Sequence, residues 1–90
     1  MAIKFTKDPD AVLDYALDWS QWLVTGDTIS AATSTPDSGL TVDSTAFTGT
    51  KTTTWLSGGT AGTTYAVTVH VTTTEGREDD RTLTIVVKDR

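Results

Sequence analysis

The chain has 90 residues and a formal net charge of −5, with 12 acidic and seven basic side chains and no cysteine. Without cysteine it forms neither disulfides nor thiolate metal sites, and it lacks the basic stripe that nucleic-acid-binding proteins carry, which excludes that class. This length suits one small domain with a thin core, so we expect a single domain over residues 1–90. Threonine contributes 21 residues, and because it favours strands over helix interiors, the composition predicts an all-β fold.

The sequence shows no sign of a membrane or secretory segment. The first ten residues, MAIKFTKDPD, lack the apolar run of a signal peptide, and no stretch of 18 apolar residues occurs. We therefore expect a soluble protein with no membrane partner, which leaves a cell only by assembly or lysis.

The N-terminal part predicts two strands separated by a break. Residues 3–6 form a short first strand, which ends at 7–10 because Pro9 lacks a donor and restricts the residue before it. Apolar and polar residues then alternate over residues 12–19, with Trp19 on the apolar side. This period of two predicts a strand, and it places Trp19 in the core.

The segment after this strand predicts one helical turn near residues 20–23. Trp19, Trp22 and Leu23 have the i, i+3, i+4 spacing of one helical face, and a polar residue just before the turn can cap it. We expect this single turn to link two strands.

The middle of the chain predicts two more strands around a loop. Residues 28–33 form a strand, and the turn-forming residues 34–39, which include Pro36, form a loop. Residues 40–47 form the next strand, whose apolar residues change phase along its length. A bulge near residues 43–44 reconciles the two phases.

A short strand over residues 51–56 precedes a glycine-rich segment. Residues 57–62, which include Gly58 and Gly59, predict a flexible loop that crosses from one sheet to the other. The segment contains no lysine and opens no helix, so it is not a phosphate-binding loop.

The C-terminal third predicts a β-hairpin with one buried side. An odd-numbered loop keeps its apolar residues on one side of both strands, whereas an even one turns half of them outward. A three-residue loop over 75–77 sets Val67 opposite Ile85, and a five-residue loop shifts the pairing by one step. The expected inward residues are Tyr65, Val67, Val69, Val71, Leu83, Ile85 and Val87.

Seven short strands spaced by about ten residues predict a two-sheet sandwich with Greek-key connections. Residues 62–69 resemble the approach to strand F of fibronectin type III and other immunoglobulin-like domains. The resemblance implies that Tyr65 is a tyrosine corner, whose hydroxyl bonds the backbone of the preceding loop. Antibody domains carry a cysteine pair that is missing here.

Over nearly its full length the chain resembles a family of small structural proteins of tailed phages, of the fiber–tail adaptor type. The motifs that carry the resemblance are KDPD (7–10), LDY (13–15), DWSQWL (18–23), DTI (27–29), GLTV (39–42), WLSGG (55–59) and RTLTI (81–85). It implies a non-enzymatic virion component that assembles as a multicopy or homo-oligomeric protein with tail, fiber or head proteins. A capsid decoration protein and a carbohydrate-binding module are the alternatives.

Several acidic residues raise the question of metal binding or catalysis. Asp8, Asp10, Asp14, Asp18 and, further on, Asp27 offer oxygen ligands for Ca²⁺, but their spacing is not that of a calcium loop. On a strand, Asp14 and Asp18 stand about 13 Å apart, which is too far for one ion. We expect a solvated acidic surface and no metal or cofactor.

No catalytic group is predicted. Glycosidases use two carboxylates facing each other across a cleft, whereas Glu78, Asp79 and Asp80 fall at the end of a hairpin. His70 is the single histidine and shares the polar side of its strand with Thr68 and Thr72, so we expect it on the surface.

Two tryptophans are the candidate interface anchors. Trp22 and Trp55 stand beside predicted turns, where an indole ring is either at the edge of the core or exposed for a protein or sugar contact. Pro36, Gly58 and Gly59 lie in loops that we expect to touch neighbouring proteins.

Overall fold

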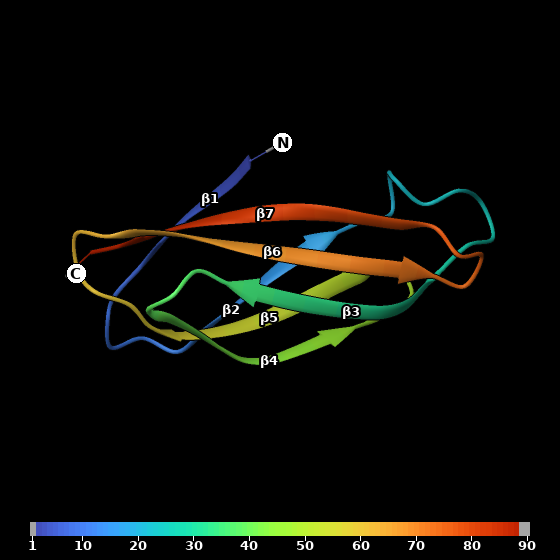
Figure 1. Ribbon diagram of the computed structural model, residues 1–90. Helices are drawn as coiled ribbons and strands as arrows, with labels where there is room; N and C mark the ends of the chain where they lie inside the picture. Colours follow the sequence, from blue (N-terminus) through green and yellow to red (C-terminus); the bar gives the residue numbers. More distant parts are fainter. Residues whose placement is uncertain (1, 89–90) are drawn as a thin grey trace.

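The structure, a computed structural model, describes residues 2–88 as seven strands (Figure 1). The strands are β1 (Ala2–Lys7), β2 (Leu13–Asp18), β3 (Ile29–Pro36), β4 (Leu40–Phe47), β5 (Lys51–Gly58), β6 (Thr64–Thr73) and β7 (Glu78–Val87). No helix occurs within residues 2–88, and so none that is long and apolar enough to cross a membrane. The all-β prediction is confirmed.

The strands form two sheets, ordered β1-β7-β6-β3 and β2-β5-β4, in a body of 43 × 22 × 19 Å (Figure 1). Strands β2 to β7 take the places of strands B to G of an immunoglobulin constant-type domain, with B-E-D in one sheet and C-F-G in the other. The first strand differs from that plan, because β1 pairs in parallel with β7. The prediction of an immunoglobulin-like two-sheet sandwich is confirmed.

The β6–β7 hairpin has an odd loop, as predicted, but the five-residue alternative is the one that forms. Thr72 pairs with Glu78, and Val67 therefore lies opposite Leu83 rather than Ile85. The loop closes through hydrogen bonds from the Thr73 N–H to the Arg77 carbonyl, at 2.7 Å, and from the Arg77 N–H to the Thr73 hydroxyl. The parity rule cannot distinguish the two odd loops, because both bury the same residues.

Two predicted loops are shorter than expected. Strand β3 continues to Pro36, which pairs with Val67, so the expected loop over 34–39 shrinks to residues 37–39. A proline is tolerated there because β3 is an edge strand. Strand β5 likewise continues to Gly58, which pairs with Leu40. The predicted bulge in β4 is confirmed by a register shift between Val42 and Ser44.

The segment after β2 makes a hydrogen-bonded turn but no helix. The N–H groups of Trp22 and Leu23 both donate to the Trp19 carbonyl, at 3.0 and 3.1 Å. The Asp18 carboxylate accepts the Ser20 N–H at 2.9 Å and so begins the turn. The bond from the Leu23 N–H is the i to i+4 bond of one helical turn, so the single turn predicted near residues 20–23 is present and no helix continues from it.

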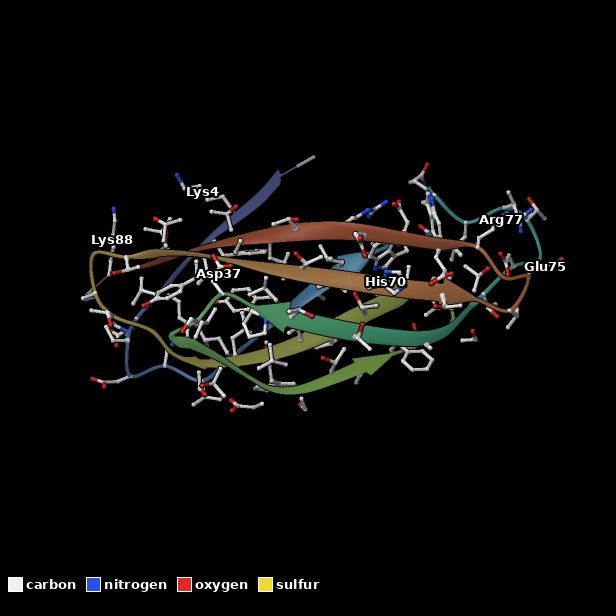
Figure 2. The ribbon with its side chains drawn as sticks, in the orientation of Figure 1. Lys4, Asp37, His70, Glu75, Arg77 and Lys88 are labelled. Atoms are coloured by element: carbon white, nitrogen blue, oxygen red, sulfur yellow. The ribbon has the colours of Figure 1, made fainter. Side chains whose placement is uncertain are left out.

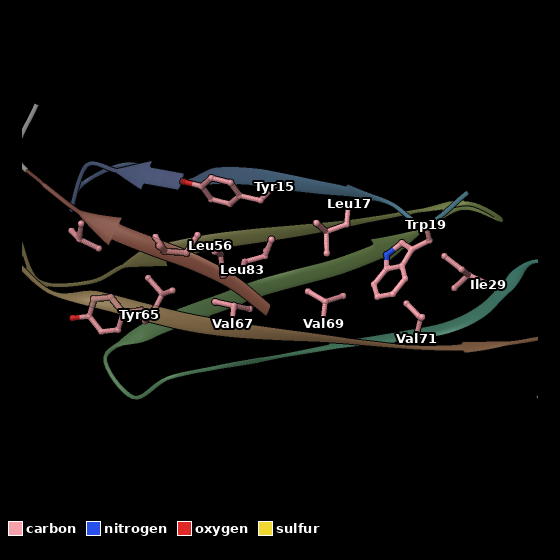
Figure 3. Close-up of a cluster of buried hydrophobic side chains, with 13 residues drawn as sticks. Tyr15, Leu17, Trp19, Ile29, Leu56, Tyr65, Val67, Val69, Val71 and Leu83 are labelled. Carbon is pink, nitrogen blue, oxygen red and sulfur yellow. The ribbon is translucent and has the colours of Figure 1, made fainter. Parts of the chain in front are cut away.

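The core lies between the sheets, along the line where β2 faces β6 (Figure 3). Its buried side chains alternate along each strand, as the period of two requires. The fully buried apolar residues are Trp19, Leu56, Val67, Val69, Val71, Leu83, Ile85 and Val87. Burial of this continuous row is the main term that holds the two sheets together.

Tyr65 closes the core at one end of the sandwich. Its hydroxyl oxygen accepts a hydrogen bond from the Thr60 N–H at 2.9 Å, five residues upstream, in the manner of a tyrosine corner. Its ring lies against Gly39, and a Cβ at Gly59 would come within 2.8 Å of Val87 Cγ2 and 3.4 Å of the ring. Gly39 and Gly59 both have positive φ, so glycine is needed here for conformation and for space.

Candidate protein interface

The outer side of the β2-β5-β4 sheet presents one large aromatic side chain, Trp55. It lies on β5, the central strand, on the side opposite to its buried neighbours Thr54 and Leu56, and 40% of it is exposed. By register Asp14 of β2 stands on one side of it and Ser44 of β4 on the other. The ring therefore sits at the centre of a sheet side that nothing in residues 2–88 covers.

The side chains next to Trp55 are small. The adjacent row across the sheet consists of Ala16, Thr53 and Ala46, which are paired in register. A flat surface of small residues with one prominent indole is the form of a protein-binding hot spot, in which the aromatic anchor fills a pocket of the partner. We call this surface, made by Asp14, Ala16, Ser44, Ala46, Thr53 and Trp55, the Trp55 face.

The Trp55 face and its rim are acidic. Asp14 lies on it, and Asp18 and Asp43 lie at its margins, with Lys51 as the basic residue opposite Asp18. The pKa of Asp18 is lowered mainly by the hydrogen bond from the Ser20 N–H, with help from the Ser20 hydroxyl and the charge of Lys51. Its carboxylate stays ionised at neutral pH, so the rim favours a partner with basic side chains.

The other predicted interface residues do not converge on this face. Trp22 is half-buried and packs edge-to-face on the fully buried Trp19, with ring centroids 5.6 Å apart. Pro36 pairs with β6 in the other sheet. Gly58 is exposed on β5 and its carbonyl accepts a bond from Lys7, while Gly59 backs onto the core.

The outer side of the other sheet carries His70 (Figure 2), which hydrogen-bonds two carboxylates. Its Nδ1 lies 2.5 Å from Asp80 Oδ1 and its Nε2 lies 2.8 Å from Glu78 Oε1. These hydrogen bonds raise the pKa of His70, because the imidazolium donates to both carboxylates, and the bond with Asp80 has the larger effect. Both ring nitrogens are thereby occupied, and the cluster ties β6 to β7.

The acidic residues considered as calcium ligands are scattered. Asp8 accepts the Asp10 N–H within the loop before β2, whereas Asp14 and Asp18 face outward from β2. Asp27 pairs with Arg77, which lies at the end of the sandwich that holds the β6–β7 loop (Figure 2). Within residues 2–88 no three His, Cys, Asp or Glu side chains are grouped so that they could hold a metal ion.

Sequence reasoning missed the structural role of Asp27. Its carboxylate is fully buried and accepts hydrogen bonds from the Thr28 N–H, the Thr74 hydroxyl and the Glu75 N–H, with Arg77 Nη1 at 3.1 Å. Burial raises its pKa, but the hydrogen bonds outweigh burial and lower the pKa to about 2. Asp27 thus fastens the β2–β3 connection to the β6–β7 loop, which no local pattern reveals.

Lys7 is the second residue whose role the sequence hid. The sequence predicts Lys7 in the exposed break after the first strand, but its side chain is fully buried. Its Nζ donates to the carbonyls of Asp8 and Gly58 at 2.9 and 2.8 Å. Its own carbonyl accepts the Lys88 N–H. Lys7 therefore joins the ends of β1, β5 and β7, and a lysine in a polar turn gives no sign of this in sequence.

The fold and this surface define a small immunoglobulin-like module with an aromatic-centred sheet side. Compared with protein-family models, residues 7–86 match the family described as podophage GP4 fiber-tail adaptor protein gp77. Because the match spans most of the chain, the protein belongs to this family of phage tail adaptors. A comparison with curated proteins finds no match.

Proposed function

We propose that the chain is a non-enzymatic adaptor that joins fiber and tail proteins in the virion through protein–protein contacts, and that the Trp55 face is its docking surface. The observation that carries the docking surface is the placement of Trp55. Strand β6 turns Tyr65, Val67, Val69 and Val71 inward, whereas Trp55 stands outward on the central strand of an uncovered sheet side. Membership of the adaptor family supports the role itself.

The mechanism is attachment by surface complementarity. The indole supplies a large rigid contact at small entropic cost, the small neighbours let a partner approach closely, and the acidic rim selects basic side chains and steers association. The partner we infer is thus a tail or fiber protein with a pocket for an aromatic ring and arginine or lysine around it.

Complementation of a phage that lacks this protein tests the proposal. Wild-type protein supplied from a plasmid should restore particles with attached fibers, whereas Trp55→Ala should lower the yield of such particles sharply, because truncation of a hot-spot aromatic weakens binding by about 30-fold or more. Thr82→Ala, on the outer side of the other sheet, is the matched control and should restore them fully. Electron micrographs and thermal melts of each purified variant separate failed attachment from failed folding.

The same particles distinguish the adaptor from a capsid decoration protein. An adaptor is present in a small number of copies at the tail, so quantitative gel densitometry should give far fewer copies than capsid subunits. Copies in the hundreds, or full complementation by a well-folded Trp55→Ala protein, would contradict the proposal.

A further inference from the structure

The four edge strands of the sandwich are guarded unequally. Natural edge strands carry charges, bulges or prolines that prevent pairing with another chain. Lys4 lies on β1, Asp14 and Asp18 lie on β2, and Asp43 lies at the bulge of β4. Strand β3, with the sequence ISAATSTP, carries no charge.

Hydrogen bonds show which backbone groups of this edge are open. The Asp37 N–H, just past the end of β3, donates to the Ala66 carbonyl at 2.8 Å and so points toward β6. In an antiparallel ladder alternate residues point to the same side, so Thr35 and Thr33 also bond to β6. The residues between them direct their N–H and C=O groups away from the sheet.

The open groups form a short window. Ala32 and Ser34 present N–H and C=O groups to the outside, with Thr33 at the centre between them. A register shift at Ser30 ends the window on one side, and Pro36, which has no N–H, ends it on the other. The window is therefore centred on Thr33, and its position sets the register of any strand that pairs with it.

We propose that a second copy of this chain pairs with this window, β3 against β3, antiparallel about a two-fold axis through Thr33. Ala32 of each copy then lies opposite Ser34 of the other. Each such pair exchanges two hydrogen bonds, so the contact makes four, and the β1-β7-β6-β3 sheets of the two copies join into one.

Charge favours a second copy at this edge over the edges of β2 and β4. The net charge of −5 makes two copies repel wherever acidic strands meet, as at β2 or β4. Strand β3 brings no charge into the contact. Asp37, at its end, falls opposite Ile29 of the other copy, and the two Asp37 residues are about 26 Å apart.

Phe47 adds an apolar surface beside the same edge. Thr45 of β4 bonds the Ser34 hydroxyl of β3 across the side of the sandwich, and Phe47 follows two residues later on the same side of its strand. Its side chain is 44% exposed. An exposed phenylalanine next to an uncharged edge is the combination that a strand-pairing contact uses, with hydrogen bonds along the edge and burial beside it.

Thr33→Cys tests the pairing directly, because the chain has no cysteine of its own. The two Thr33 residues form a non-hydrogen-bonded pair with Cα atoms about 4.5 Å apart, within the range of a disulfide. Under mild oxidation Thr33→Cys should run mostly as a covalent dimer on a non-reducing gel. Thr35→Cys should stay monomeric, because the two Thr35 residues are about 13 Å apart in this register.

Sedimentation without oxidation gives a second measurement. Thr33→Lys places two ammonium groups opposite each other and should lower the association constant of the dimer at least tenfold. Thr41→Lys, which changes an exposed residue of β4, should dimerise as strongly as the wild type. Equal crosslinking of both cysteine variants overturns the proposal, because it shows random collision. A wild type that remains monomeric at all concentrations also overturns it and leaves the edge to a strand of a different protein. None of the four variants changes a residue of the Trp55 face, so these results are independent of the adaptor role.

Discussion

The inner and outer sides of the β2-β5-β4 sheet each hold a tryptophan, and the two side chains have opposite surroundings. Trp19, just after β2, is fully buried, its Nε1–H donates to the Thr52 hydroxyl at 3.0 Å, and the guanidinium of Arg81 lies 4.2 Å above its ring. Trp55 is 40% exposed among small residues. The difference shows that the two sides of one sheet place the same residue type either in the core or in contact with solvent.

The largest expected effect comes from removing the buried ring. Trp19→Ala should lower the free energy of unfolding by about 3–5 kcal/mol, because it leaves a large cavity and removes the partner of Thr52 and Arg81. Trp55→Ala, the matched control, should lower it by less than about 1 kcal/mol. Guanidinium denaturation of both variants measures the contrast, and equal losses would remove the distinction between the two sides.

A similar contrast is expected between a buried and an exposed carboxylate. Asp27→Asn should lower the melting temperature at pH 7 by about 5–10 °C, because the neutral amide loses the ion pair with Arg77 and accepts fewer hydrogen bonds. Asp14→Asn, at an exposed carboxylate, should change the melting temperature at pH 7 by less than about 2 °C.

The stabilising contribution of Asp27 should decrease as the pH falls. Its pKa of about 2 in the folded state lies below its usual value of 3.8, so its contribution is present above pH 4 and is lost as the pH falls toward 2. The melting temperatures of wild type and Asp27→Asn should therefore converge in acid. A difference that stays constant between pH 7 and pH 2 would contradict this assignment.

The smallest effect is expected at His70, on the outer side of the other sheet. Its pKa is raised in the folded state, so its contribution is complete below its ordinary pKa of 6.5 and is lost as the pH rises through the folded value. His70→Gln should therefore melt a few degrees below wild type at pH 5.5, with the gap closing by pH 9. A gap that widens with pH would show that His70 acts in its neutral form.

Much of the fold could be predicted from local pattern. Alternation placed the strands, and parity gave the buried sides of β6 and β7, because a strand with one buried side repeats every two residues. Parity did not separate the three-residue loop from the five-residue loop. That choice depends on the bonds between Thr73 and Arg77, which the alternation does not record.

The candidate site was harder to predict, since its elements come from different parts of the chain. Trp55 was identified as a candidate anchor, but its neighbours Ala16 and Ala46 lie about 40 and 10 residues away and look like ordinary strand residues. Contacts between distant segments also determine the parallel pairing of β1 with β7. The same is true of the buried hydrogen bonds made by the Lys7 ammonium and the Asp27 carboxylate. Only the three-dimensional structure brings these residues together.

Hydroxyl-radical footprinting of the free protein and of intact phage particles tests the central claim most directly. In the free protein, oxidation read by mass spectrometry should modify Trp55 strongly and Trp19 hardly at all. In the particle, Trp55 should become protected as its partner covers it, while exposed residues on the outer side of the β1-β7-β6-β3 sheet remain reactive. Equal oxidation of Trp55 in both states would contradict the account, because the face would then have no partner in the virion.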